Sequence, residues 1–323
     1  MVKVFEPPVY CYHEIVHNRL IVESFRSRGV VFVDDLADVP PGAPLMLSAH
    51  GSPPDVLERA RTNGGAVVDA VCPLVTKVHH EVKVRSEKGY TILYVGHAGH
   101  EETVGTMAVA PQSVKLLEDD SDVSSLDDLD PELSDVALLA QTTLSVDEWS
   151  GFMEAARARF PNLWMPGRSD LCFATTNRQA ALKEISKHAD AVVVIGSANS
   201  SNTLALEQVA IGSGCPRVIR INESSELPDD LHGVVGVTAG ASAPESLVRD
   251  VLDALAPRLG VDEIQVVDEE EYFPPPPELR ELLRGVATAL WLFSASGRAH
   301  KPEDPVGTDR NTPAAGVLKQ LAS

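Results

Sequence analysis

The chain has 323 residues, a formal net charge of −20 at pH 7 and an apolar fraction of 44%. This length allows two or three domains with cores of their own, and the negative charge argues against nucleic acid or an anionic membrane as a partner. No apolar run reaches the roughly 20 residues needed to cross a bilayer. Four cysteines and no signal peptide predict a protein of the reducing cytoplasm, where cysteines are more often metal ligands, catalytic groups or core residues than disulfides.

Strands and helices alternate from the start of the chain. Four short apolar segments predict strands at residues 8–12, 30–33, 44–47 and 66–68. Helices are predicted from the N-cap Asn18 to the stop at Gly29, and from Pro54 to Thr62. The predicted fold class is therefore α/β with parallel sheets, in which ligand sites lie beyond the carboxyl ends of the strands.

The middle and last thirds of the chain repeat one plan. Cys72 and Cys172 each stand before a helix-like segment, and each segment leads to an apolar strand that ends in a glycine, Gly96 or Gly196. The cysteine-to-glycine distance is 24 residues in both copies. The first third fits this plan only if its cysteine and first helix precede Met1, so the first unit is expected to be incomplete.

The repeat predicts three pseudo-symmetric α/β lobes around a central site, at residues 1–71, 72–171 and 172–283. Acidic and proline-rich residues after Val267 mark the end of the third unit, and the helix-like residues 278–283 are expected to pack back onto it. Residues 284–323 turn to Gly, Ser, Pro and charge, so we expect a largely disordered C-terminal extension.

Cys72 and Cys172 are candidate metal ligands. A single free cysteine is often a small buried core residue, and we expect this of Cys215. Two cysteines at equivalent turns of a repeat, each beside helix-start hydroxyls, favour ligation of one shared metal centre. No C-x-x-C spacing is present, which excludes a zinc ribbon and a two-cluster ferredoxin run.

Polar side chains gather after the predicted strands. The set comprises His13, His50, His100, Thr142, Ser200, Ser201, Asn202 and Ser242. Each alone could be a cap or turn residue, but together they predict a donor-rich pocket for phosphate oxygens. Glu102 is the only carboxylate that the sequence places among them, which makes it a candidate proton carrier.

The segment from His13 to His17 fits the H-E-x-x-H pattern of zinc proteases. That pattern needs a helix to bring both histidines to one face. Here it follows a strand, and the helix is expected to begin only after Asn18, so a protease is disfavoured.

With these residues assembled, the chain resembles the LytB family of 4-hydroxy-3-methylbut-2-enyl diphosphate reductases. The matching motifs are His13 to Arg19, Ser48 to Gly51, Cys72 to His79, Gly96 to His100, Gln141 to Ser145, Cys172 to Gln179, Asn199 to Asn202 and Thr238 to Pro244. Several are long and unusual, so the resemblance is specific from about Pro8 to about Leu283.

The resemblance implies a three-lobed α/β fold around an oxygen-sensitive [4Fe-4S] cluster. Electrons from a ferredoxin or flavodoxin then remove the substrate hydroxyl as water, giving isopentenyl and dimethylallyl diphosphates. By the same resemblance, Cys72 and Cys172 are cluster ligands, and His100, Glu102 and Thr142 deliver protons and orient the hydroxyl. The implied diphosphate-binding residues are His13, His50, His100, Ser200, Ser201, Asn202 and Ser242.

This sequence departs from the family pattern at two places. The family's first cysteine, in a Gly-Phe-Cys-Ala-Gly-like turn, has no counterpart, and Cys11 aligns within the strand that follows the missing helix. Beyond Asn202, apolar residues replace the usual polar ones. We therefore expect a reductase whose start is placed too far downstream or whose front has been lost. The alternatives are a paralogue that binds diphosphate or a partner without turnover, and a zinc hydrolase using His13, His50 and Cys72.

Overall fold

A computed structural model of the chain describes residues 1–267, 281, 284–285 and 288–289. The chain divides into two compact units, Met1–Val267 and Asp268–Ser323, and every element below belongs to the first. Apart from these few positions after residue 267, the expected helix at 278–283 and the expected disorder of 284–323 lie outside the described residues. In the part of the chain that is described, no helix has the length and apolar character to span a membrane.

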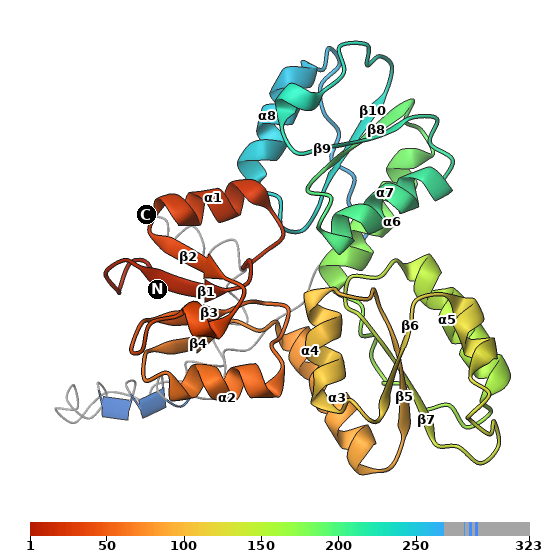
Figure 1. Cartoon of the computed structure of the whole chain (residues 1–323). Helices are drawn as coiled ribbons and strands as arrows, with labels where there is room; N and C mark the ends of the chain where they lie inside the picture. The colour runs from red at the N-terminus through yellow and green to blue at the C-terminus, as the bar shows by residue number, and fades with distance from the viewer. Residues whose placement is uncertain (268–280, 282–283, 286–287, 290–323) are drawn as a thin grey trace, which may run out of the picture. The chain divides into compact units, whose positions relative to one another are not determined.

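Three separate sheets, parallel in every strand pair, organise the first unit (Figure 1). The first has the order β2-β1-β3-β4, with β1 Val9–Tyr12, β2 Val30–Val33, β3 Leu45–Leu47 and β4 Val67–Asp69. The second has the order β6-β5-β7, with β5 Thr91–Val95, β6 Val114–Leu117 and β7 Val136–Ala140. The third has the order β10-β8-β9, with β8 Ala191–Ile195, β9 Val218–Ile221 and β10 Val235–Ala239. The predicted fold class is confirmed.

The helices show that the three sheets are copies of one plan. A helix follows each central strand, namely α1 Arg19–Ser27, α4 Glu101–Val109 and α7 Ser201–Gly212. Short 3₁₀ turns (Leu36–Asp38, Asp120–Ser125 and Ser224–Glu226) come before the third strands, and α2 Pro54–Thr62, α5 Val146–Arg159 and α8 Glu245–Leu255 come after them. Two further helices, α3 Pro73–Glu87 and α6 Phe173–Ser186, lead into β5 and β8. Each sheet with its helices is called a lobe below.

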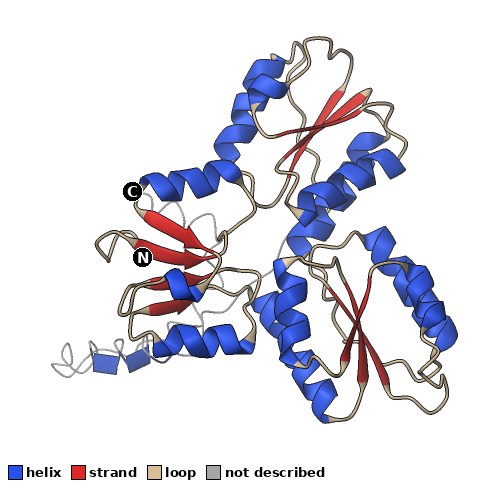
Figure 2. Ribbon diagram, viewed as in Figure 1, coloured by secondary structure: helices blue, strands red, loops and turns tan. Residues whose placement is uncertain are grey.

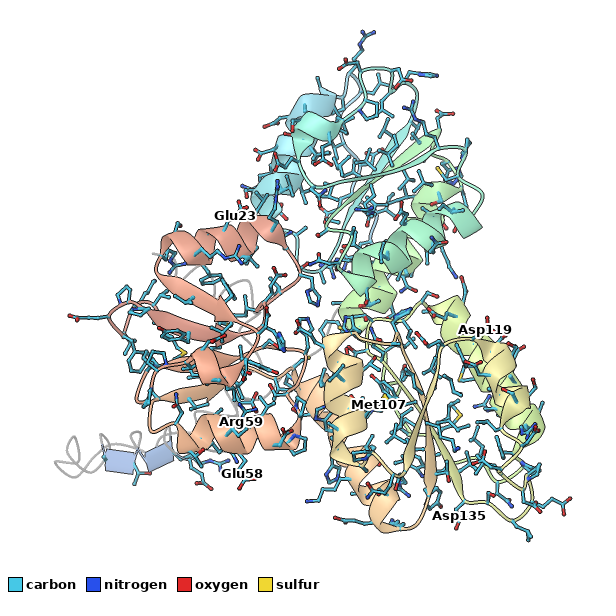
Figure 3. The ribbon with its side chains drawn as sticks, viewed as in Figure 1. Glu23, Glu58, Arg59, Met107, Asp119 and Asp135 are labelled. Carbon is cyan, nitrogen blue, oxygen red and sulfur yellow. The ribbon has the colours of Figure 1, made fainter. Side chains whose placement is uncertain are left out.

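The strands β5, β7 and β8 are buried along nearly their whole length because helices cover both faces of their sheets (Figures 1 and 2). In β5, Leu93 and Val95 belong to the core shared with α5, whereas Ile92 and Tyr94 belong to the core shared with α3. Each fully buried side chain of this size stabilises the lobe by about 1.5–3 kcal/mol. Charged side chains stand on the outside, as Glu23, Glu58 and Asp119 show in Figure 3.

The carboxyl ends of the strands carry the predicted site residues. In the second lobe, β5 ends before Gly96 and the N-terminus of α4, and β7 ends before Gln141 and Thr142. Parallel strands end at one edge of a sheet, so these two loops are neighbours. The same topology places Ser200 after β8 and the Gly240 loop after β10.

Candidate active site

Cys72 and Cys172 occupy equivalent positions at the starts of two helices. Each is the N-cap residue of its helix, with φ and ψ of −61° and 134° for Cys72 and −66° and 127° for Cys172. Burial raises the pKa of the half-buried Cys72 thiol, backbone N–H groups of Leu74 and Val75 oppose this rise, and the nearby Cys172 adds to it. Cys172 is thus close enough to Cys72 to act on it electrostatically, and each cysteine stands at a helix N-terminus.

Backbone hydrogen bonds tie both cysteine turns to the polar loops. The N–H of Cys72 donates to the carbonyl of Ala49 at 3.0 Å, and the N–H of Cys172 donates to the carbonyl of Thr142 at 2.8 Å. Ala49 precedes His50 in the chain. Each candidate metal ligand is thus held directly against a loop that carries a predicted site residue.

Glu102 is a buried acid, 2% exposed, in the first turn of α4. Thr142 donates to it twice, from its N–H to Oε1 at 2.8 Å and from its hydroxyl to Oε2 at 2.9 Å. Burial is the largest influence and raises the pKa of Glu102 to about 7, although both bonds from Thr142 oppose this rise. A carboxyl group that titrates near neutral pH can give or take a proton.

Three imidazoles gather beside this acid. The rings of His17 and His50 are stacked with centroids 4.3 Å apart, and His100 meets them edge-on at 5.6 Å and 5.7 Å. Burial, then His50 and His17, lower the pKa of His100 to about 4, so its ring is neutral near pH 7. The Nδ1 atom of His100 accepts from the N–H of Glu102 at 3.2 Å, which leaves the proton of the neutral ring on Nε2 as a donor.

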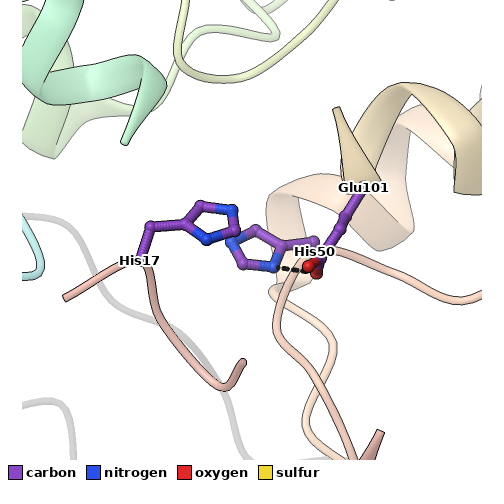
Figure 4. Close-up of side chains that lie close together, drawn as sticks. All are labelled: His17, His50 and Glu101. Atoms are coloured by element: carbon purple, nitrogen blue, oxygen red, sulfur yellow. Dashed lines mark hydrogen bonds and ion pairs between the residues drawn. The ribbon is translucent and has the colours of Figure 1, made fainter. Parts of the chain in front are cut away.

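A second carboxylate, Glu101, lies in this cluster (Figure 4). Its Oε2 is 2.8 Å from Nδ1 of His50 and accepts from the hydroxyl of Ser48 at 3.4 Å. Burial alone would raise the pKa of Glu101, but His50, through its hydrogen bond and charge, brings the pKa below its ordinary value. The expectation that Glu102 is the only carboxylate among the donors is therefore wrong.

His17, His50 and Glu101 come close to forming a metal site without the geometry of one. One donor atom from each lies within 4.8 Å of the others. An imidazole lone pair lies in the plane of its ring, so two rings stacked at 12° cannot both direct lone pairs at one ion between them. This arrangement suits hydrogen bonding to an anion better than coordination of zinc, and it includes neither His13 nor Cys72.

The third lobe contributes polar groups from the start of α7. Ser200 is the N-cap and accepts from the N–H of Thr203 at 3.4 Å, and Ser201 beside it is half-buried. Asn202 is 5% exposed, and within the described chain both polar atoms of its side chain lack a hydrogen-bond partner. A buried unpaired amide costs about 1–3 kcal/mol, so this side chain is suited to a ligand. The hydroxyl of Ser242 donates to the carbonyl of His17 at 3.3 Å.

His13 makes no ring contact with the three imidazoles, although it also contributes to the lowered pKa of Glu101. It has a left-handed backbone with φ of 59°, and its Nδ1 is 3.4 Å from Asp34, whose side chain is 98% exposed. As expected, the H-E-x-x-H segment is not helical, since α1 begins only at Arg19, after the N-cap Asn18. The predicted core position of Cys215 is confirmed, and Cys11 is buried in β1.

Comparison with known proteins agrees with this geometry. A family model described as LytB protein matches residues 1–256. The chain belongs to the LytB family. This match confirms the predicted resemblance. Among the relatives, a 4-hydroxy-3-methylbut-2-enyl diphosphate reductase of Acidothermus cellulolyticus is 45% identical over 301 residues. The match covers 91% of this chain and 88% of the relative. The reductase of Tropheryma whipplei is 45% identical over 281 residues, covering 85% and 89%.

Solved LytB structures share the fold. The E-1-hydroxy-2-methyl-but-2-enyl-4-diphosphate reductase from Plasmodium falciparum superposes with a TM-score of 0.76 at 32% identity, covering 80% of this chain and 81% of that one. A second, an (E)-4-hydroxy-3-methyl-but-2-enyl diphosphate reductase, the terminal enzyme of the non-mevalonate pathway, gives a TM-score of 0.57 at 27% identity, covering 79% and 90%.

The sequence did not single out two residues that the structure brings into this cluster, His17 and Glu101. His17 is the second histidine of the H-E-x-x-H pattern, and Glu101 directly precedes Glu102 in the first turn of α4. A signal for each was present in the sequence. For His17, the signal is its place immediately before the N-cap Asn18. For Glu101, it is the helix geometry: adjacent residues point about 100° apart, so Glu101 and Glu102 can each face a polar group.

Proposed function

We propose that this chain removes the hydroxyl group of 4-hydroxy-3-methylbut-2-enyl diphosphate to give isopentenyl and dimethylallyl diphosphates. The observation that carries the proposal is the pairing of Cys72 and Cys172 at equivalent helix starts, directly beside the Glu102–Thr142 pair. Membership of the LytB family, with relatives named as this reductase, supports it.

The two cysteine turns can supply two of the ligands of an iron–sulfur cluster, and the family's first cysteine has no counterpart in this sequence. Both cysteines are half-buried, both stand at helix N-termini, and Cys172 acts electrostatically on Cys72. Cys11 is buried in β1, where burial raises the pKa of its thiol to about 12, and Cys215 packs in the core of the third lobe. Among the described residues, Cys72 and Cys172 are therefore the cysteines offered to a [4Fe-4S] group, which when bound supplies the reducing electrons.

The diphosphate is held by neutral donors and imidazoles. The proposed set is His17, His50, His100, Ser200, Ser201, Asn202 and Ser242, with a smaller contribution from His13, which faces Asp34. The unpaired amide of Asn202 and the Nε2–H of His100 support this assignment, because preorganised donors in a poorly hydrated site bind charge strongly. Local donors are needed, because the formal charge of the chain is −20 and its overall field repels anions.

Glu102 and Thr142 manage the proton and the hydroxyl. Removal of the hydroxyl consumes two electrons and two protons: the C–O bond breaks, one proton converts the hydroxyl to water, and the other forms the new C–H bond. Glu102 can hold one of these protons near neutral pH, because burial raises its pKa to about 7. Thr142 donates a hydrogen bond to each carboxyl oxygen of Glu102 and so fixes the orientation of the carboxyl group that transfers the proton.

The electron donor and the location of the protein are also proposals. A ferredoxin or flavodoxin is the expected class of donor, because the reaction needs electrons at low potential. The four cysteines are free thiols in the structure, which is compatible with the predicted reducing cytoplasm.

Anaerobic purification with iron and sulfide analysis tests the function. We expect about four irons and four sulfides per chain, together with reduction of the diphosphate substrate by a strong artificial electron donor. Cys72→Ser and Cys172→Ser should each lose most of the iron, whereas Cys215→Ser should keep it. A preparation without metal supports the non-catalytic paralogue instead, and zinc without sulfide supports the hydrolase.

A further inference from the structure

A partly buried ion pair links the two cysteine turns. Lys77 lies on α3, five residues after Cys72, and Asp170 lies two residues before Cys172. The Nζ atom of Lys77 is 3.0 Å from Oδ1 of Asp170. The side chain of Asp170 has 0% exposure and that of Lys77 has 29%. The pair thus joins one cysteine-bearing helix to the segment that carries the other cysteine.

Lys77 holds more than one acceptor of that segment. Its Nζ also donates to the carbonyls of Arg168 at 2.7 Å and Ser169 at 3.0 Å. An ammonium group has three N–H donors, and here each has an acceptor. Three consecutive residues that lead to Cys172 are therefore held by one side chain of α3.

The other side of the segment is fixed to the second sheet. Oδ2 of Asp170 accepts from the N–H of Ala140 at 3.2 Å, at the end of β7. The N–H of Cys172 donates to the carbonyl of Thr142 at 2.8 Å. The approach to Cys172 thus lies between β7 and Lys77, and removal of Lys77 leaves the buried carboxylate of Asp170 without its ion-pair partner.

We propose that Lys77 and Asp170 are positioning residues that set the separation of the Cys72 and Cys172 sulfurs before a cluster is bound. This inference rests on the proposed function, in which both sulfurs hold one cluster. A fixed separation lowers the entropy lost when both thiolates bind one rigid group. Neither side chain acts on the substrate.

The chain offers a matched control in Lys183 and Asp147. Their Nζ–Oδ1 distance is 2.7 Å, and the pair joins α6 to α5. Both side chains are more exposed, at 38% and 67%. Lys183→Met therefore removes a lysine–aspartate bridge between two helices without touching the segment before Cys172.

The test measures how readily the two sulfurs meet in the cluster-free, reduced full chain. Cys11→Ser and Cys215→Ser provide a background in which Cys72 and Cys172 are the only thiols. Dibromobimane becomes fluorescent when it bridges two thiols, and monobromobimane reports the reactivity of each thiol alone. We expect Lys77→Met to slow bridging, relative to single alkylation, by about tenfold or more, and Lys183→Met to leave the ratio unchanged.

A second variant and a second measurement keep the outcome decisive. Asp170→Asn keeps the shape of the side chain but removes its charge, and it should also slow bridging if Lys77→Met does not fold. In the cluster-loaded chain, Lys77→Met should release iron to a chelator faster than Lys183→Met does. Bridging at the Lys183→Met rate in both Lys77→Met and Asp170→Asn overturns the positioning role. Absence of bridging in the unmodified site instead overturns the shared cluster of the proposed function.

Discussion

Glu102 has the most consequential environment of any single residue in the site. Because burial raises its pKa to about 7, its protonated fraction falls as pH rises through about 7. A reaction that takes a proton from Glu102 should therefore lose kcat/KM above this pH. Glu102→Gln keeps the shape of the side chain but has no proton to give, so kcat/KM should fall by about 10²- to 10⁴-fold.

Glu101→Gln is the matched control for this prediction. The pKa of Glu101 is lowered, so this carboxyl is ionised at neutral pH and has no proton to give there. Its substitution should leave the decline above about pH 7 in place. Steady-state kinetics of both variants from pH 6 to 9 measure kcat/KM. If the kcat/KM of Glu102→Gln lies within threefold of the parent value, the proton-donor role is excluded.

The two histidines of the H-E-x-x-H segment should contribute unequally to substrate binding. His17 is stacked on His50 and is 14% exposed in its side chain, whereas His13 faces Asp34. His17→Ala should therefore raise KM by about 10- to 100-fold, the loss expected of a hydrogen bond to a charged group. His13→Ala should change KM by much less. The reverse order in measured KM values would restore the sequence-based assignment to His13.

At the scale of elements, the first and second lobes approach each other closely at two glycines. A Cβ added to Gly105 on α4 would lie 2.3 Å from the carbonyl oxygen of Gly51, the residue after His50. This approach brings the N-terminus of α4, with His100 and Glu101, against His50. The site therefore depends on the absence of a side chain at Gly105.

Gly105→Ala should destabilise the fold by about 1–3 kcal/mol, because overpacking forces α4 away from the Gly51 loop. It should also weaken substrate binding, because Glu101 and His50 separate. The control is Gly212→Ala at the end of α7, where an added Cβ meets nothing within 4 Å, and which should be neutral or slightly stabilising. Urea denaturation of both variants measures the difference, and equal stability would show that the lobes tolerate a wider spacing.

The elements themselves were predictable because their signals are local. The strand at residues 30–33, the helix from Pro54 to Thr62 and the N-cap Asn18 all lie where the sequence places them. Apolar runs, caps and glycine stops act over a few residues. The equal cysteine-to-glycine distances also predicted the repeat correctly, because Cys72 and Cys172 are both N-caps of the helices before central strands.

The site was predictable only in part because its geometry is set by contacts distant in sequence. His13 has a positive φ, and the ring that stacks on His50 is that of His17. The partner of Glu101 lies 51 residues away, in the first lobe. The order of residues does not encode which of two neighbouring side chains faces such a partner. The clamp of Lys77 on Asp170, 93 residues apart, is hidden for the same reason.

At the scale of the whole molecule, buried imidazoles make stability depend on acid. Burial lowers the pKa of both His79 and His100 to about 4, and within the described chain Nε2 of His79 has no hydrogen-bond partner. A histidine whose pKa falls on folding contributes stability above its unfolded pKa, near 6.5, that is lost as pH drops toward 4. Glu102 acts in the opposite sense, because its raised pKa gives stability at low pH that is lost through about 7.

His79→Leu separates these effects because His79 lies outside the proposed site, on the buried face of α3. A difference of 6.5 against about 4 in pKa corresponds to at most about 3 kcal/mol between neutral and acidic pH. We expect the unfolding free energy of the parent to fall between pH 7 and pH 4.5, and that of His79→Leu to fall by about 1–3 kcal/mol less. His188→Gln, whose side chain is 77% exposed, should follow the parent. Urea denaturation at both pH values gives the three slopes, and parallel slopes for the parent and His79→Leu would mean that His79 takes up its proton without unfolding the chain.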